Sequence, residues 1–136
     1  MPVFSYQRKI HVYETDLMGI VHHSNYLRFC EEARVEWFQK NGVQVLTKED
    51  VFGLVVVETR VKHKSPIRYG EKLTIDVQLK AEGPKLIIQY RLLSDNRLSA
   101  LAETVHCRID QNFKVLRLDQ KITQRMENEK WTETWL

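Results

Sequence analysis

Apolar and polar residues alternate along much of the second half of the chain. Leu73, Ile75, Val77 and Leu79 are separated by Thr, Asp and Gln, so one face of this segment is apolar and the other is polar. That period of two is typical of a half-buried β-strand. Judged by the same pattern and by their β-branched residues, we predict strands at residues 3–13, 54–64, 73–80, 85–93, 99–110 and 114–118.

The turns between these strands are short. Glu82-Gly83-Pro84 separates the third predicted strand from the fourth, and Ser94-Asp95-Asn96-Arg97 separates the fourth from the fifth. Gly, Pro, Asn and Asp are the usual residues of such turns. Because a short connection can only join neighbours that run in opposite directions, we expect an antiparallel meander.

The period changes at Ser24. From there the apolar residues follow helical spacing on one face: Tyr26, Phe29, Cys30, Ala33 and Trp37. Ser24 is a candidate N-cap, and Asn41-Gly42 is a suitable stop. We therefore predict one helix of about five turns, and we leave open another helical turn in the connection 43–52.

A sheet that is apolar on one face must have that face covered, and this helix is the only predicted element long enough to cover it. The expected fold class is α+β, with one long central helix wrapped by a curled antiparallel sheet of five or six strands. No linker or repeat interrupts the chain, so residues 1–136 form a single domain. Residues 120–136 are expected to be an appendage, docked, if at all, by Trp131 and Trp135.

Composition narrows the function. The chain has 136 residues, 43% apolar and 29% charged, with a formal charge of +3. The basic residues are scattered among acids, which argues against nucleic acid and suits a small anionic ligand. No apolar run suggests a signal peptide or a membrane span. The two cysteines lack metal-type spacing, so we expect a cytoplasmic protein without a metal or other cofactor.

The segment between the first strand and the helix carries the candidate chemistry, with Asp16, Gly19, His22 and His23 close together. One interpretation is a turn only, since Asp and Gly are common turn residues. A metal site on Asp16, His22 and His23 is disfavoured, because adjacent histidines rarely face one ion and no ligand spacing supports it. Ser24 as a nucleophile is disfavoured, because a Gly-x-Ser-x-Gly elbow is missing.

A third interpretation uses the helix start. The first N–H groups of a helix lack intrahelical partners and lie at the positive end of its dipole. Such groups polarise a carbonyl and hold the oxyanion that forms on attack. Asp16, folded back by the turn at Gly19, would attack the acyl carbon or activate a water. This chemistry favours a good leaving group such as a thiolate.

These residues also carry a resemblance. The string YETDLMGIVHHSNY at residues 13–26, followed by Leu27-Arg28-Phe29 and Glu31-Glu32-Ala33-Arg34, resembles the 4-hydroxybenzoyl-CoA thioesterase family of hotdog-fold enzymes, in its YbgC-like branch. The resemblance covers roughly residues 3–118 and includes PIRYGE at residues 66–71. It implies hydrolysis of a small or medium acyl-CoA, or of an acyl-carrier thioester, to the free acid and thiol.

The resemblance also implies roles for single residues. Asp16 matches the catalytic carboxylate, as nucleophile or general base, and the backbone N–H of His23 matches the group that polarises the thioester carbonyl. His22 would orient substrate or water, and Glu32 is taken as a surface or helix-pairing residue. The expected substrate-binding residues are Gly19, Ile20, Val21, Asn25 and Tyr26. Cations for the CoA phosphates are expected among Lys62, Lys64 and Arg68.

A homo-oligomer is expected, because a curled sheet leaves an open edge that invites pairing. The resemblance implies a dimer with a continuous sheet, paired into a tetramer, and a site at the subunit interface. A non-catalytic acyl-CoA-binding hotdog protein is the main alternative, although it would be expected to lack the carboxylate that Asp16 supplies. A hotdog dehydratase would need a histidine in a different helix context.

Overall fold

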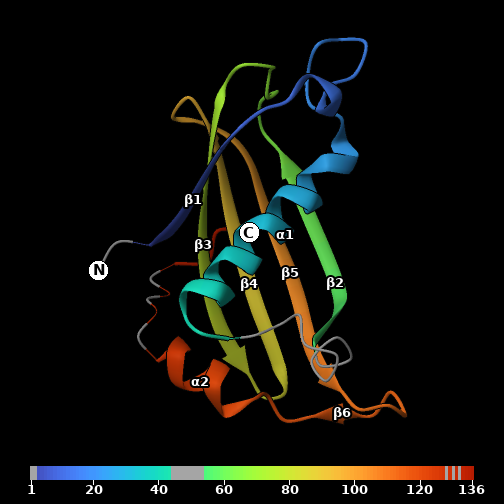
Figure 1. The fold of residues 1–136 in the computed structure, drawn as a ribbon, viewed down its shortest axis with the longest axis vertical. Helices are drawn as coiled ribbons and strands as arrows, with labels where there is room; N and C mark the ends of the chain where they lie inside the picture. Colours follow the sequence, from blue (N-terminus) through green and yellow to red (C-terminus); the bar gives the residue numbers. More distant parts are fainter. Residues whose placement is uncertain (1–2, 44–53, 128, 130, 132) are drawn as a thin grey trace.

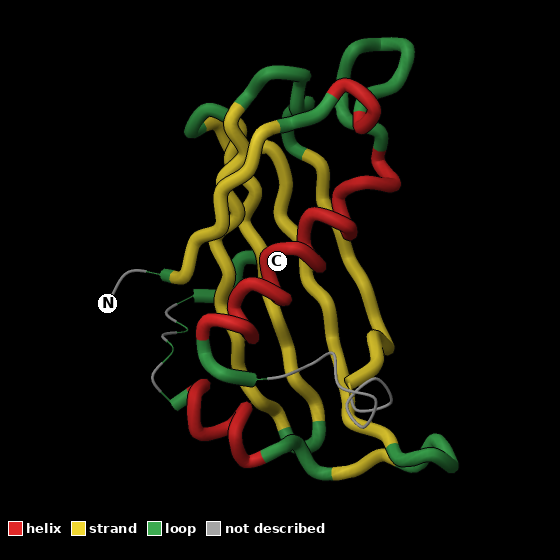
Figure 2. The backbone as a smooth tube through the Cα atoms, viewed as in Figure 1, coloured by secondary structure: helices red, strands yellow, loops and turns green. Residues whose placement is uncertain are grey.

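The computed structural model describes residues 3–43, 54–127, 129, 131 and 133–136. A long helix lies across one face of an antiparallel sheet (Figures 1 and 2). The strand order is β1-β3-β4-β5-β2, and β6 pairs with β5. The strands are β1 (Phe4–Lys9), β2 (Leu54–His63), β3 (Lys72–Glu82), β4 (Lys85–Ser94), β5 (Arg97–Ile109) and β6 (Val115–Leu116).

The long helix is α1 (Tyr26–Lys40), and a shorter helix, α2 (Gln120–Met126), follows the sheet. Two 3-10 turns, Val12–Glu14 and His23–Asn25, lie between β1 and α1. The second of these runs directly into α1, so helical backbone is continuous from His23 to Lys40. Among the helices that the structure describes, none is long and apolar enough to cross a membrane.

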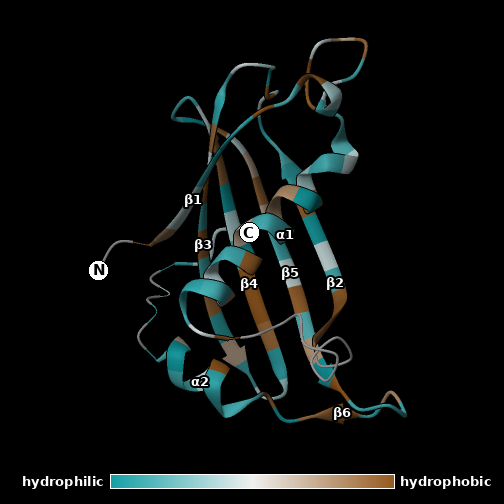
Figure 3. Ribbon diagram, viewed as in Figure 1, coloured by the Kyte–Doolittle hydropathy of each residue, from teal (hydrophilic) through white to brown (hydrophobic). Residues whose placement is uncertain are grey.

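The core lies between α1 and the inner face of the sheet. Hydrophobic and hydrophilic bands alternate along the central strands (Figure 3), as the period of two predicts. The apolar face of α1 is fully buried, since Phe29, Cys30, Ala33 and Trp37 are all 0% exposed. The central helix is therefore confirmed, and so is the antiparallel meander with its short turns from β3 to β6. Its extension to residues 54–64 is wrong, because β2 pairs with β5 at the edge of the sheet and not with β3.

The predicted first strand is wrong in its second half. β1 ends at Lys9, and Val12, expected on the same side as the buried Ile10, is exposed. The reason is the buried Glu14, whose carboxylate accepts the His11 N–H at 2.8 Å and pairs with Arg8 at 2.8 Å. Drawing this carboxylate inward bends the chain out of the sheet and into a 3-10 turn.

Other differences are smaller. The last predicted strand, 114–118, is reduced to the two residues of β6, and the connection 43–52 lies outside the described residues except for the buried Val43. The appendage is packed against the rest of the chain, since Ile122 and Met126 of α2 join the core cluster. Trp131 and residues 133–136 lie against the sheet face opposite α1, where Trp135 and Glu133 contact β3 and β4.

A polar chain crosses the core beneath α1. The Tyr90 hydroxyl lies 2.6 Å from Thr104 Oγ1, and His106 Nε2 lies 2.8 Å from the same oxygen. Burial, and secondarily the charge of Arg34, lowers the pKa of His106 to about 3. A proton on His106 is therefore strongly disfavoured while the protein is folded.

Candidate active site

Asp16 begins a closed loop of the backbone. Thr15 and Val21 form an isolated antiparallel bridge, and the Asp16 N–H donates to the Ile20 carbonyl oxygen at 2.8 Å. The Gly19 N–H returns to the Asp16 carbonyl oxygen at 3.0 Å, and Gly19 has a φ of 77°. Glycine adopts this left-handed conformation without the steric cost that a β-carbon brings. Asp16 and the start of the helix are therefore the two arms of one turn.

The Asp16 side chain is half-buried and makes the local bond that a turn residue is expected to make. Its Oδ1 accepts the Met18 N–H at 2.8 Å. That bond fixes the carboxyl group relative to the loop. The turn interpretation and the catalytic interpretation thus describe the same geometry, because a carboxylate held through one oxygen still presents the other, Oδ2.

The helix start differs from the expectation in its cap. The predicted N-cap Ser24 is wrong: the 3-10 turn is capped by His22, whose Nδ1 accepts the Ser24 N–H at 3.2 Å and lies 2.8 Å from Ser24 Oγ. An extended backbone at His22 allows the imidazole nitrogen to replace a hydroxyl oxygen here. Ser24 is therefore inside the turn, two residues after the N-cap His22.

His23 is the first residue of this helical run. The N–H of a first helical residue has no intrahelical acceptor and lies at the positive end of the dipole. The His23 ring is exposed and lies 4.2 Å from the His22 ring, at 31° to it. The His23 N–H thus lies on the arm of the loop opposite Asp16.

Glu14 fixes the loop and the start of the helix relative to each other. Its carbonyl oxygen accepts two hydrogen bonds, from the His22 N–H at 3.0 Å and from Asn25 Nδ2 at 2.9 Å. Its carboxylate pairs with Arg8, which also lies over the Phe29 ring. The loop and the helix start are therefore anchored to β1 and to the core through one buried residue.

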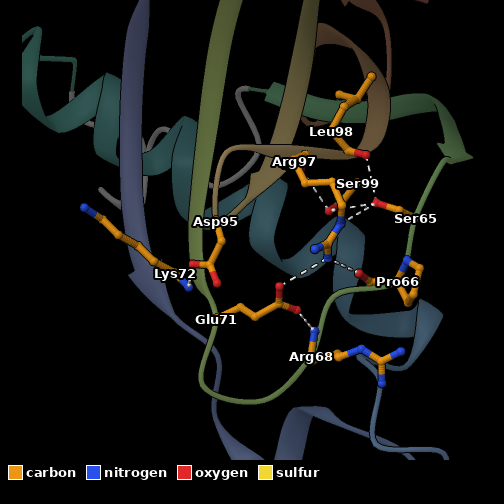
Figure 4. A network of polar contacts seen from close by, with 9 residues as sticks. All are labelled: Ser65, Pro66, Arg68, Glu71, Lys72, Asp95, Arg97, Leu98 and Ser99. Carbon is orange, nitrogen blue, oxygen red and sulfur yellow. Dashed lines mark hydrogen bonds and ion pairs between the residues drawn. The ribbon is translucent and has the colours of Figure 1, made fainter.

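The segment before β3 holds the loop from the other side. The Val21 N–H donates to the Ile67 carbonyl oxygen at 2.7 Å, and Ile20 forms an isolated bridge with Arg68. Arg97 braces this segment by donating to the Pro66 carbonyl oxygen, Ser65 Oγ and the Glu71 carboxylate (Figure 4).

The expected substrate-binding residues divide into two groups. Gly19 is exposed and Ile20 is half-buried, whereas Val21, Asn25 and Tyr26 are buried. Tyr26 meets the ring of His63 edge-on at 4.5 Å, and its burial raises its pKa. The buried residues Val21, Asn25 and Tyr26 therefore support the loop from the side of the core.

The expected phosphate-binding cations are also separated. Arg68 lies beside the loop through its bridge with Ile20. Lys64 is exposed just after β2, and its N–H is bound to the Ser99 carbonyl oxygen. Lys62 lies on β2 opposite Leu101, on the sheet face away from α1. Of the three, Arg68 is the one that the fold brings to the loop.

The sequence analysis gave no role to Arg8, Glu14, Glu71 and Arg97, although Glu14 and Glu71 lie within the two strings that carry the resemblance. No periodic signal marks them, because each acts through a partner distant in sequence. A charged residue at a position that becomes buried, as at Glu14, is the one sign that the sequence carries.

The surroundings of the loop are apolar and exposed. Tyr13, Leu17, Met18 and Tyr69 are each more than three-fifths exposed, and Leu17 is 107% exposed. Such a group of large apolar side chains suits a ligand or a protein contact. Within the described residues, no three His, Cys, Asp or Glu side chains are grouped so as to hold a metal ion.

Comparison with known proteins agrees with this architecture. Residues 10–134 match the thioesterase-like superfamily. The chain is 32% identical over 111 residues to a 1,4-dihydroxy-2-naphthoyl-CoA hydrolase of Thermosynechococcus vestitus, covering 77% of this chain and 75% of that protein. It is 36% identical over 72 residues to the acyl-CoA thioesterase YbgC of Helicobacter pylori, covering 53% of each.

Solved structures show the same fold. A 1,4-dihydroxy-2-naphthoyl-CoA thioesterase from Synechocystis superposes with a TM-score of 0.87 at 22% identity, over 93% of this chain and 97% of that chain. A protein from Aquifex aeolicus superposes with a TM-score of 0.82 at 29% identity, over 90% of this chain and 98% of that one. The expected hotdog architecture is confirmed. The chain belongs to the thioesterase-like superfamily, and it is a hydrolase of the hotdog-fold thioesterase type.

Proposed function

We propose that the chain hydrolyses the thioester of a small or medium acyl-CoA, with Asp16 as nucleophile or general base and the His23 N–H as the carbonyl-polarising group. The observation that supports this proposal is the closed loop from Thr15 to Val21. The Asp16 carboxylate and the backbone N–H groups at the start of the helix both belong to this loop or follow it directly. Relatives named as acyl-CoA thioesterase and as 1,4-dihydroxy-2-naphthoyl-CoA hydrolase support the substrate class.

The proposed reaction uses two groups of the protein. The thioester oxygen accepts the His23 N–H, and Asp16 Oδ2 either attacks the carbonyl carbon or removes a proton from an attacking water. The carbon–sulfur bond then breaks, and the CoA thiolate leaves without a strong acid because its conjugate thiol has a pKa near 8.5. By the nucleophilic route a mixed anhydride forms, which water hydrolyses to the acid and Asp16.

The supporting roles follow from the contacts. We assign to His22 the positioning of substrate or water, to Gly19 and Ile20 the contact surface, and to Val21, Asn25 and Tyr26 its buried support. Arg68 is the favoured phosphate partner, because it lies beside the loop. Lys62 and Lys64 are the further candidates.

A homo-oligomer, dimer or tetramer, is part of the proposal. β2 is an edge of the sheet, and its Val56 and Val57 are about half exposed. Unpaired edges of this kind invite a second strand. Pairing two copies along β2 would extend the sheet and help to cover the apolar group around the loop. Light scattering should give at least a dimer mass, and a monomer would contradict an interfacial site.

We also place the protein in the cytoplasm, on its cysteine chemistry. Cys30 and Cys107 are both free and buried, and burial raises the pKa of Cys30 to about 12. Such thiols are unreactive and need no partner.

The deciding experiment follows free thiol after the protein is mixed with aliphatic and aromatic acyl-CoAs and with acyl-carrier thioesters. We expect turnover of at least one acyl-CoA, unchanged by a chelator. Saturable acyl-CoA binding without any thiol release would favour the non-catalytic alternative. Activity that is lost to the chelator and restored by zinc would revive the metal interpretation of Asp16, His22 and His23.

A further inference from the structure

The face of the sheet opposite α1 carries a row of polar side chains. Gln78, Gln89, Glu103 and Arg60 lie directly opposite one another on four neighbouring strands. Gln78 Nε2 donates to Gln89 Oε1 at 2.9 Å, Gln89 Nε2 donates to Glu103 Oε1 at 2.9 Å, and Arg60 binds the other Glu103 oxygen. We call this set the polar row.

Within the segment at residues 131–136 the structure describes Trp131 and residues 133–136, and this part is bound across the row through the backbones of Glu133, Trp135 and Leu136. The Trp135 N–H donates to Gln89 Oε1 at 2.8 Å, and Gln78 Nε2 donates to the Glu133 carbonyl oxygen at 2.9 Å. A longer bond of 3.4 Å joins Gln89 Nε2 to the Leu136 carbonyl oxygen. Each amide nitrogen has two hydrogens to donate, so the row uses one hydrogen of each glutamine and the segment uses the other.

The two glutamines are buried to a degree that is unusual for the polar face of a strand. Gln78 is 1% exposed and Gln89 is 0% exposed. A buried amide N–H left without a partner costs about 1–3 kcal/mol. With the segment in place, its backbone supplies partners that these buried amide groups need.

Two cations hold the tryptophans of this segment. Lys80 Nζ lies 4.5 Å from the centre of the Trp131 ring, and the Arg91 guanidinium lies 4.5 Å from the centre of the Trp135 ring. Asp76 fixes Arg91 through two bonds, the shorter at 2.8 Å. Val105 and Cys107 point to the same sheet face and are buried, yet neither belongs to the core cluster under α1.

We propose that this face of the sheet is a peptide-binding site whose ligand is the segment at residues 131–136 of this chain, docked as a detachable strap. The backbone contacts and both cation–ring contacts come from β3 and β4, and none comes from α2. Recognition of the segment therefore does not depend on its covalent connection to the rest of the chain. This binding is separate from acyl-CoA hydrolysis and does not rest on it.

The test supplies the strap as a separate molecule to full-length protein. The double variant Trp131→Ala/Trp135→Ala weakens the chain's own strap and leaves the site intact. A fluorescein-labelled synthetic peptide of residues 129–136 is titrated with this variant and with the wild type, and its anisotropy is followed. We expect the variant to bind the peptide at least tenfold more tightly, because the attached strap competes in the wild type at an effective concentration on the order of millimolar.

Site substitutions in the same double variant show where the peptide binds. Arg91→Met is expected to weaken binding about threefold by removing the cation over the Trp135 ring. Gln89→Leu is expected to weaken it at least tenfold by removing the bonds to the backbone of residues 135 and 136. Gln7→Leu is the matched control, since Gln7 is an exposed glutamine on the same face of the neighbouring strand β1, and it should change nothing.

Melting curves accompany each variant, and Arg91→Met carries the test if Gln89→Leu does not fold. Three results would each overturn the proposal: no saturable binding by the double variant, equal binding by the double variant and the wild type, or unchanged binding by the folded site variants.

Discussion

Asn25 Nδ2 lies 2.9 Å from the carbonyl oxygen of Glu14, so the start of the long helix is tied to the chain that enters the loop from Thr15 to Val21. Asn25 is buried, and the same oxygen also accepts the His22 N–H. One carbonyl thus sets the position of both arms of the loop relative to each other. The rate of hydrolysis should depend on this bond more than its contribution to stability alone would suggest.

Asn25→Ala tests that dependence. We expect a loss of about 0.5–1.5 kcal/mol in the free energy of unfolding, because one of the two hydrogen bonds to this carbonyl oxygen is lost. We also expect a fall in kcat of about tenfold or more, because a small misplacement of reacting groups is costly. Asn41→Ala is the control: Asn41 Nδ2 makes the same kind of bond, to the Trp37 carbonyl oxygen at 2.8 Å, at the other end of α1. Equal losses of kcat in both variants would show that only helix stability is at work.

Asp16→Asn separates the two roles that the carboxylate plays. Asn can accept the Met18 N–H as Asp16 does, so the loop should persist. The negative charge is lost, and we expect kcat to fall by about 10²–10⁴-fold, or roughly 3 to 5 kcal/mol of transition-state stabilisation. Thiol release, a binding titration with acyl-CoA and a melting curve are the measurements.

Asp110→Asn is the matched control for that substitution. Asp110 Oδ1 also accepts backbone N–H groups in a turn, from Asn112 at 2.8 Å and Lys114 at 3.0 Å. This turn joins β5 to β6, far from the loop at residues 15–21 (Figure 1). Asp110→Asn should keep wild-type turnover. If Asp16→Asn also turns over at the wild-type rate, the proposed mechanism fails, and if it does not fold, Asp16 is a turn residue first.

Two substitutions of His22 divide capping from chemistry. His22→Ala removes the acceptor for the Ser24 N–H and should cost about 1 kcal/mol of stability. His22→Asn restores a good cap without an imidazole. We expect His22→Asn to recover the wild-type melting temperature but not the wild-type rate of hydrolysis. Thermal denaturation and thiol release are the measurements. Full recovery of both would reduce His22 to a cap.

Acid should destabilise the protein through His106. Its pKa is about 3 in the folded chain against 6.5 when unperturbed, so below about pH 6.5 the unfolded state binds the proton first. Stability is then constant above that pH and falls as pH drops toward 3, by up to about 1.4 kcal/mol per pH unit. Urea unfolding between about pH 7 and pH 5 avoids most carboxylate titration.

The variant His106→Leu should flatten that slope while lowering stability at neutral pH, where the bond to Thr104 is lost. His11→Leu, which replaces an exposed histidine, is the control for the loss of an imidazole. An unchanged slope in His106→Leu would mean that His106 is protonated as easily in the folded chain as in the unfolded one.

The sequence predicted what depends on periodicity. The strands around Ile75 and the helical stripe around Ala33 follow from which side chains must leave water, and their local pattern is enough. The loop from Thr15 to Val21 was also found, because Asp16 and Gly19 have strong turn preferences. Their function came from a resemblance and not from the pattern itself.

What was missed depends on distant partners. Val12 was placed in the first strand because nothing local shows that Arg8 draws Glu14 inward. Ser24 was preferred as the cap because a hydroxyl is the common acceptor, whereas His22 takes that place. Gln78 stands on the polar face that the alternation predicts, yet it is 1% exposed and donates to the Glu133 carbonyl oxygen, 55 positions away.

The polar row also bears on how the strands find their alignment. Sliding one strand by a single residue turns its apolar side chains outward, which the core forbids, but a slide of two residues restores the alternation. The apolar face alone therefore tolerates several alignments of β4 between β3 and β5. A two-residue slide would set Gln89 beside neither Gln78 nor Glu103 and would break both bonds that join β4 to the row. The hydrophilic side of this sheet thus distinguishes alignments that its hydrophobic side accepts equally.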